Sequence, residues 1–101
     1  MSDILKNCIQ KCQKCKTMCK NMNMQNCVKV CNDCEILCNL LDTCCNKIND
    51  ESLKKGLYKL IMKACKKCII ECKKHDHKEC KECVKACQEC IKMCEKKCDK
   101  M

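Results

Sequence analysis

The sequence predicts an all-α protein, an antiparallel up-down-up-down four-helix bundle with a cysteine-lined core. First, the 101 residues include no proline and one glycine, while the helix-favouring residues Lys, Leu, Glu, Gln and Met are abundant. Second, cysteines recur at alternating steps of four and three residues, the period of one helix face. Third, short polar segments divide the chain. The length suits one compact domain, which we expect to span residues 1–101.

Three polar segments mark the expected turns between helices. They are NMNMQN at 21–26, NKINDES at 46–52 and KKHDHKE at 73–79. In the last segment, Asp76 followed by Glu79 resembles a capping box with Asp in the Ser/Thr position, which predicts a helix start. Connections this short favour antiparallel neighbours. We therefore expect helices near residues 3–21, 25–47, 51–74 and 77–99.

Most of the nineteen cysteines fall on one narrow stripe of each expected helix, because successive residues are rotated by about 100°. These are the inward-facing a and d positions of a bundle. In the third helix, Leu57, Ile61 and Ala64 precede the cysteines on the same stripe. Helix by helix, the stripes contain Cys8, Cys12, Cys15 and Cys19; Cys27, Cys31, Cys34, Cys38 and Cys45; Cys65, Cys68 and Cys72; and Cys80, Cys83, Cys87, Cys90, Cys94 and Cys98.

Stacking the four stripes in antiparallel order predicts flat layers of four thiols. Beyond three such layers the thiols become fewer: Ile61 is expected to face Cys8, Cys38 and Cys90, and Leu5, Leu41 and Leu57 to face Cys94. The bundle should therefore have a thiol end and an apolar end. From the thiol end, the predicted layers are Cys19, Cys27, Cys72 and Cys80; Cys15, Cys31, Cys68 and Cys83; and Cys12, Cys34, Cys65 and Cys87.

A core of thiols needs an explanation beyond packing. A single buried cysteine often serves as a small hydrophobe, but many small side chains cannot fill a four-helix interior to the usual density of about 0.75. Disulfides along one helix are disfavoured, because Cβ atoms three or four residues apart lie about 5–6 Å from each other, beyond the ~4.5 Å that a bridge tolerates. Bridges between helices remain open, although the odd number of cysteines prevents complete internal pairing.

The cellular compartment bears on the state of these thiols. The first residues, MSDILKNCIQKC, contain no basic segment followed by an apolar run, so we expect no signal peptide. No stretch is long and apolar enough to suggest a membrane span. We therefore expect a cytoplasmic protein whose cysteines are free thiols or metal thiolates in a reducing environment.

Metal thiolate chemistry can be argued from charge. A Zn²⁺ ion held by four thiolates carries two net negative charges, and several such sites in an apolar bundle would each bear a large desolvation cost. Cu(I) is a soft ion that selects thiolates, and an array with about one Cu(I) per thiolate is nearly neutral. Iron–sulfur clusters are disfavoured, because ferredoxin ligands follow compact loop spacings. A zinc–thiolate buffer and a thiol redox protein remain as alternatives.

The repeated C-x₃-C-x₂-C-x₃-C stripes on four short-linked helices resemble the four-helix-bundle copper storage proteins over essentially the whole chain. The resemblance implies intracellular storage or sequestration of many Cu(I) ions, commonly in two-coordinate thiolate sites, and a homotetramer. It extends to all the stripe cysteines named above. Two features depart from it: Cys44 lies about 100° from the stripe through Cys45, and the first half of the third helix carries no cysteine.

Candidate weak ligands gather at the thiol end. Met22 and Met24 lie in the first turn, and His75 and His77 lie in the third turn, at the same end of the predicted bundle. Taken alone, such residues are ordinary packing or surface residues. Together they suggest a mouth where Cu(I) passes between a copper donor or acceptor protein and the core thiolates. The family resemblance likewise implies His or Met ligands at the open end.

Several other function classes are disfavoured. The formal net charge is +9, but every basic residue is lysine and the only aromatic residue is Tyr58, so we expect no nucleic-acid partner and no membrane partner. No glycine-rich phosphate loop or nucleophile–base pair is evident, so we do not expect an enzyme. Apolar residues outside the thiol stripes favour self-association; they are Val30, Ile36, Leu37, Leu40, Ile69 and Ile70.

Overall fold

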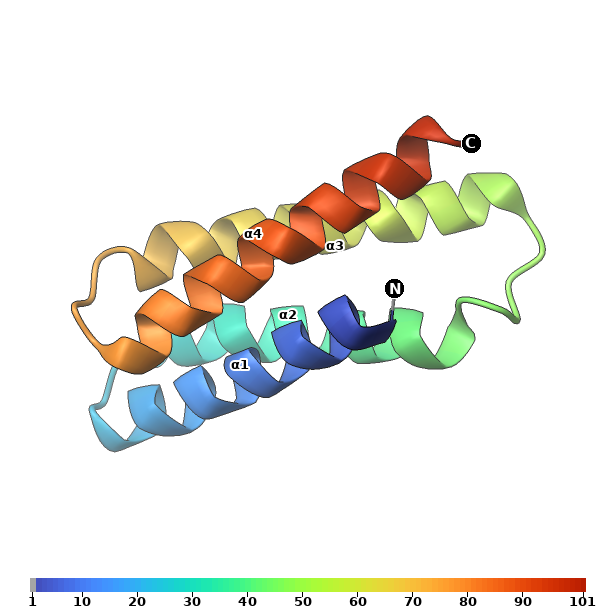
Figure 1. The fold of residues 1–101 in the computed structure, drawn as a ribbon. Helices are drawn as coiled ribbons and strands as arrows, with labels where there is room; N and C mark the ends of the chain where they lie inside the picture. The colour runs from blue at the N-terminus through green and yellow to red at the C-terminus, as the bar shows by residue number, and fades with distance from the viewer. Residues whose placement is uncertain (1) are drawn as a thin grey trace.

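The computed structural model describes residues 2–101, with side chains from Asp3 onward, and consists of four helices joined by short connections (Figure 1). This confirms the predicted all-α fold. The helices are α1 (Ser2–Asn21), α2 (Gln25–Cys44), α3 (Glu51–Cys72) and α4 (Lys78–Asp99).

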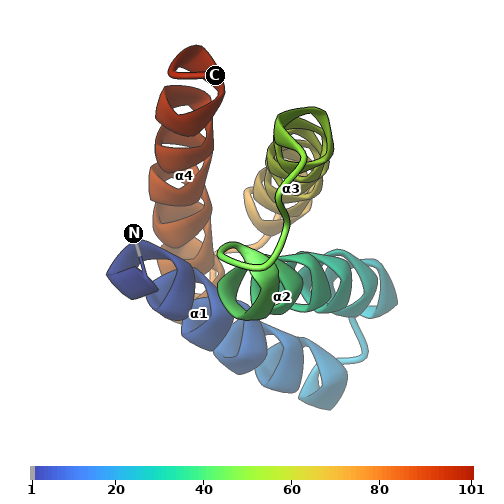
Figure 2. The same ribbon diagram turned by 90° about the vertical axis from the view of Figure 1, so that its right-hand side faces the viewer.

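The arrangement is the predicted up-down-up-down bundle. Helix α1 packs against α2 and α4, and α3 packs against the same two helices. The diagonal pairs, α1 with α3 and α2 with α4, meet through core side chains, as in the Sγ–Sγ contacts Cys15–Cys72 and Cys34–Cys87. The view in Figure 2 shows the α1–α2 hairpin beside the α3–α4 hairpin. Each helix therefore turns one stripe toward a common centre, which is the geometry that brings four cysteine stripes together.

The turn between α1 and α2 is closed by a Schellman motif. The backbone N–H of Met24 donates to the carbonyl oxygen of Cys19 at 2.9 Å, and that of Asn23 donates to Lys20 at 3.3 Å. Asn23 has a φ of 58°, a left-handed conformation that asparagine tolerates better than most residues. The motif ends α1 and holds Met24 next to the last cysteine of that helix.

Several helix boundaries differ from the prediction; helix α3, for example, ends at Cys72 rather than at residue 74. Helix α2 ends at Cys44, so the expected extension to residue 47 is wrong, and Cys45 is its C-cap. The expected capping box at Asp76 is also wrong. His77 is the N-cap of α4, and the Asp76 carboxylate instead pairs with the Lys81 ammonium at 2.8 Å. The cap of α3 follows the usual rule, because the Asp50 carboxylate accepts from the Leu53 N–H at 3.0 Å.

Cysteine makes up most of the core. Sixteen of the nineteen cysteine side chains are at most 1% exposed, and only Cys44, Cys45 and Cys98 are half-buried. Apolar side chains close the end opposite the first turn, where Leu5, Leu41 and Ile61 are fully buried. No polar or charged side chain is buried in the part of the chain that the structure describes. The predicted division into a thiol end and an apolar end is confirmed.

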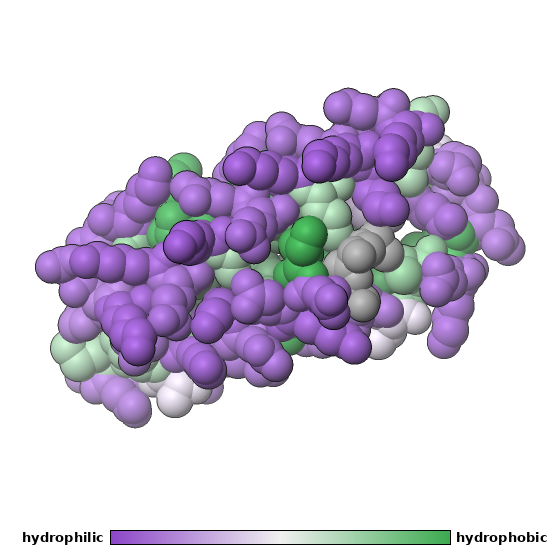
Figure 3. Space-filling model, viewed as in Figure 1, coloured by the Kyte–Doolittle hydropathy of each residue, from purple (hydrophilic) through white to green (hydrophobic). Residues whose placement is uncertain are grey.

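The exterior is mostly hydrophilic, as the space-filling view shows (Figure 3). An apolar groove between α2 and α3 interrupts it, lined in part by Val30, Ile36, Leu37 and Leu60, and the Ile36 side chain is 56% exposed. Self-association through such a surface stays a prediction. None of the helices in residues 2–101 has the length and hydropathy needed to cross a bilayer.

Two neighbouring leucines of α2 test the apolar end. Leu41 is 1% exposed and Leu40 is 45% exposed, so Leu41→Ala should lower the free energy of unfolding by about 2–5 kcal/mol because it leaves a cavity. Leu40→Ala is the matched control and should change it by less than about 0.5 kcal/mol. Urea unfolding of the reduced, metal-free protein measures both. Equal losses for the two variants would contradict this account of the core.

Candidate metal centre

The core cysteines meet sulfur to sulfur across helix boundaries. Sγ–Sγ distances are 3.5 Å for Cys68–Cys83, 3.6 Å for Cys34–Cys65 and 3.7 Å for Cys31–Cys68. A disulfide bond is about 2.0 Å long, so these are non-bonded contacts. All nineteen cysteines are free thiols. The bundle thus gathers reduced sulfur from all four helices into one interior.

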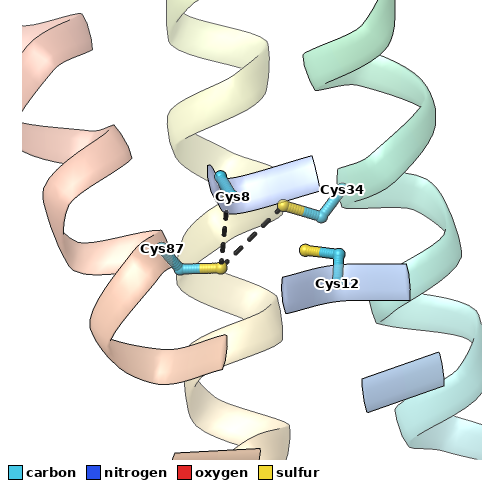
Figure 4. A group of neighbouring side chains, drawn as sticks. All are labelled: Cys8, Cys12, Cys34 and Cys87. Carbon is cyan, nitrogen blue, oxygen red and sulfur yellow. Dashed lines mark hydrogen bonds between the residues drawn. The ribbon is translucent and has the colours of Figure 1, made fainter. Parts of the chain in front are cut away.

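Five groups of four buried cysteines have all their Sγ atoms within 4.8 Å of one another. Figure 4 shows the group formed by Cys8, Cys12, Cys34 and Cys87, whose sulfurs point toward a shared centre from α1, α2 and α4. Each group offers soft sulfur donors at metal-binding separation. The other four groups are Cys8, Cys38, Cys65 and Cys90; Cys12, Cys68, Cys83 and Cys87; Cys15, Cys31, Cys72 and Cys83; and Cys15, Cys27, Cys72 and Cys80.

These groups share members and therefore form one continuous array, which we call the thiol ladder. Cys15 and Cys72 belong to both groups nearest the first turn, and Cys83 links them to the next group. Cys12 and Cys87 link that group to the one in Figure 4, and Cys8 links it to the last. A metal ion in any group would consequently share a sulfur with the group beside it.

The predicted flat layers are wrong in detail. None of the five groups contains the four cysteines of a single predicted layer. Cys15 contacts both Cys27 and Cys72, which were expected one layer away, at 3.9 and 3.8 Å. The alternating three- and four-residue steps place a thiol such as Cys15 between two thiols of a neighbouring helix, Cys27 and Cys31 of α2. The ladder is therefore staggered, and each four-thiol group shares at least one Sγ atom with the next group.

The grouping of two cysteines differs from the predicted layers. Cys65 completes the group that contains Cys8, Cys38 and Cys90, so the four-thiol groups continue further toward the apolar end. Cys19 belongs to no group within the described residues, although its Sγ lies 3.9 Å from that of Cys15. It sits beyond the ladder, at the first turn.

The ladder contains no compensating charge. Burial raises the pKa of the Cys80 thiol to about 12 and also raises the pKa of Cys27, so both thiols retain their protons at neutral pH in the metal-free state. Ion binding would have to displace such protons.

The charge of a loaded array favours one class of ion. The five groups contain fourteen different cysteines, so five divalent ions on fourteen thiolates would leave four buried negative charges. One monovalent ion per thiolate leaves none, which favours a monovalent ion.

Met24 and Cys19 border one surface pocket at the end formed by the first turn. The Met24 side chain packs against the core and is half-buried, whereas Met22 is 53% exposed. Met22 lies with Met18 in a different pocket, which has no cysteine in its lining. Of the two candidate methionines, the structure therefore brings only Met24 to a core thiol.

His75 and Cys72 border a second pocket at the same end of the bundle. The His75 Nε2 atom lies 3.1 Å from Glu71 Oε2, one helical turn earlier. Burial alone would raise the pKa of Glu71, but hydrogen bonds from His75 and Lys74 outweigh it and lower that pKa below its usual value. Glu71 is thus an ionised partner that orients the imidazole, as carboxylates do behind ligand histidines. We did not predict this role, although the i, i+4 spacing could have signalled it.

His77 has a different environment. It begins α4 as the N-cap without a side-chain capping hydrogen bond, and it does not line the pocket that His75 and Cys72 share. Neither histidine belongs to a four-ligand group in residues 3–101. The structure therefore places one methionine and one histidine beside the thiol end, and leaves Met22 and His77 further from it.

The comparisons with known proteins give one family. Residues 1–99 match the family described as "Csp: Copper storage protein", which covers nearly all of the chain and all nineteen cysteines. A search of curated proteins gave no match.

Proposed function

The chain belongs to the copper storage protein family. From this premise we propose that the protein stores Cu(I) in its thiol ladder and that it does so in the reducing environment of the cytoplasm. The ions would be bound by the core-stripe cysteines, including those at the ends of the stripes, Cys19, Cys45, Cys94 and Cys98. The role is to hold and release ions, and it requires no chemical conversion of a substrate.

The observation that carries this proposal is the sharing of thiols between adjacent four-sulfur groups. Shared sulfurs can bridge neighbouring ions, so the array can accept many ions in a small volume. Because no charged side chain is buried near the ladder, the fully loaded core must be close to neutral, and a monovalent thiophilic ion meets that condition. A partly loaded core would be anionic, and the surrounding lysines would help to stabilise it.

The thiol end is the proposed mouth for Cu(I). Met24 beside Cys19 and His75 beside Cys72 give a weak thioether or imidazole donor next to a strong thiolate donor. An ion arriving from a copper donor protein would bind such a weak donor first and then pass to the adjacent sulfur. Met22 and His77 would contribute at the outer edge of the same end.

Anaerobic titration of the reduced protein against a calibrated chelator tests the storage proposal. Cu(I) should bind to a ratio approaching one ion per thiol, and affinity should fall in acid because protons compete for the thiolates. Cys34→Ser should lower the number of Cu(I) ions bound, because Cys34 lies within the ladder. Cys44→Ser is the matched control outside the ladder and should leave that number nearly unchanged.

Other outcomes of the titration would favour the alternative functions. A zinc buffer would instead saturate near one Zn²⁺ per four thiols and prefer zinc. Failure to retain either ion would favour thiol redox chemistry.

A second experiment tests the mouth. The variant with Met22→Ala, Met24→Ala, His75→Ala and His77→Ala should take up and release Cu(I) several-fold more slowly while keeping most of the capacity, because the core thiols remain. Within this set, Met24→Ala with His75→Ala should account for most of the effect, and Met22→Ala with His77→Ala for little, since only the first pair borders core thiols. Stopped-flow transfer from a coloured Cu(I) chelate measures the rates. Transfer rates equal to those of the unmodified protein would refute the mouth.

A further inference from the structure

A groove between α3 and α4 carries a half-buried cysteine among lysines, at the end of the bundle opposite the mouth. Its thiol is Cys98, and Met62 lies beside it in the lining. The lysines of the groove are Lys59, Lys66, Lys92 and Lys96. Figure 3 shows hydrophilic side chains over the C-terminal part of α4. The groove therefore combines soft sulfur donors with positive charge.

The positive charge of this groove is not neutralised within it. Four lysines face two carboxylates, those of Glu95 and Asp99, and none of these lysines forms an ion pair with any residue that the structure describes. Four other lysines do form ion pairs, for example Lys11 with Glu82 and Lys16 with Glu35. Unpaired ammonium groups around a groove attract small anions.

Cys98 connects this groove to the thiol ladder. Cys90, Cys94 and Cys98 follow one another at four-residue steps on one face of α4, where such neighbours have Cβ atoms about 5–6 Å apart. Cys94 is fully buried, Cys98 packs against the core, and Cys90 belongs to the last four-thiol group of the ladder. The succession of thiols thus runs from a surface groove into the ladder without using the mouth.

We propose that this groove is a second port, at which Cys98 exchanges Cu(I) with small anionic Cu(I)–thiolate complexes. The inference rests on the proposed storage function and adds a class of copper carrier to it. The mouth offers neutral thioether and imidazole donors suited to a protein donor, whereas the groove offers a thiol and unpaired cations suited to a low-molecular-weight anion.

The exchange is a ligand substitution in which copper stays in the Cu(I) state. The Cys98 thiol loses its proton, and its sulfur forms a bond to the copper of the bound complex. One copper–sulfur bond to the carrier then breaks, and the released carrier thiolate takes up a proton. Cys94 repeats the substitution one turn further in, which moves the ion toward Cys90. Release of stored copper follows the same steps in reverse.

The lysines give the port its selectivity. Their field raises the local concentration of an anionic carrier, and this effect weakens as salt screens exposed charges beyond about 8–10 Å. A carrier whose ligands are charged only at sulfur forms a Cu(I) bis-thiolate with a single negative charge, so it gains less from the lysines than a carrier with additional carboxylates, but it can still react with Cys98. Carrier charge and ionic strength therefore separate the role of the lysines from that of the sulfur.

The test measures initial rates of Cu(I) uptake from two probes, the Cu(I) complex of glutathione, which is anionic, and that of 2-mercaptoethanol, whose ligand carries no charged group besides sulfur. Lys66→Gln with Lys92→Gln should slow uptake from the glutathione complex about three- to tenfold at low salt and uptake from the second probe by less than about twofold, because the second complex carries only the charge of its copper–thiolate centre. Cys98→Ser should slow both. All these variants are made in a protein that already carries Met24→Ala and His75→Ala, so that Cu(I) uptake through the mouth does not contribute to the measured rates.

Matched controls use the same chemical changes elsewhere. Lys63→Gln with Lys67→Gln removes two lysines from the other side of α3, where they line the groove facing α2, and should leave both rates unchanged. Cys44→Ser removes a half-buried thiol outside the stripe and should do the same. If the unmodified protein retains no Cu(I), the storage proposal fails. If it loads but the groove variants match these controls, the second port is wrong and storage stands.

Discussion

The structure depends on one constraint: many thiols are buried in mutual contact, and no charged group is buried with them. Sixteen cysteine side chains are at most 1% exposed, and the sulfurs of neighbouring helices approach to between 3.5 and 4.0 Å. Protonated thiols meet this constraint in the metal-free state, because they are small, weakly polar and neutral. A loaded core meets it only if the bound cations balance the thiolates, so the same constraint that permits the fold also selects the ion.

The helical periodicity turns this constraint into a storage array. Steps of three and four residues keep most cysteines of a helix on one face, and the antiparallel arrangement of four such faces brings fourteen thiols into groups with thiols of other helices. Because the resulting groups are staggered, they share Cys8, Cys12, Cys15, Cys72, Cys83 and Cys87. Ions in such an array can move between adjacent sites by exchanging one sulfur at a time. Storage and transfer then use the same ligands.

Much of the fold and of the site could be predicted from the sequence, because both follow from local patterns. Three sequence features were sufficient to predict four antiparallel helices, each with an inward-facing stripe of cysteines: the absence of proline, the polar turns and the cysteine period. The vertical stagger between helices could not be predicted, since it depends on how side chains of different helices interlock. This is why Cys65 joined Cys8, Cys38 and Cys90 in the last thiol group, and why Cys15 joined thiols from two predicted layers. The N-cap of α4 is His77 rather than Asp76, and the Asp76 carboxylate pairs with the nearby Lys81 ammonium instead of capping the helix, an alternative that the local capping pattern did not reveal.

The most direct test of the central claim is an anomalous difference map from crystals of the protein loaded anaerobically with Cu(I). We expect a row of copper peaks between the four helices, extending from the Sγ atoms around Cys80 to those around Cys90, with each peak beside at least two sulfurs. Copper confined to surface histidines and methionines, with the core thiols unoccupied or joined in disulfides, would contradict the account.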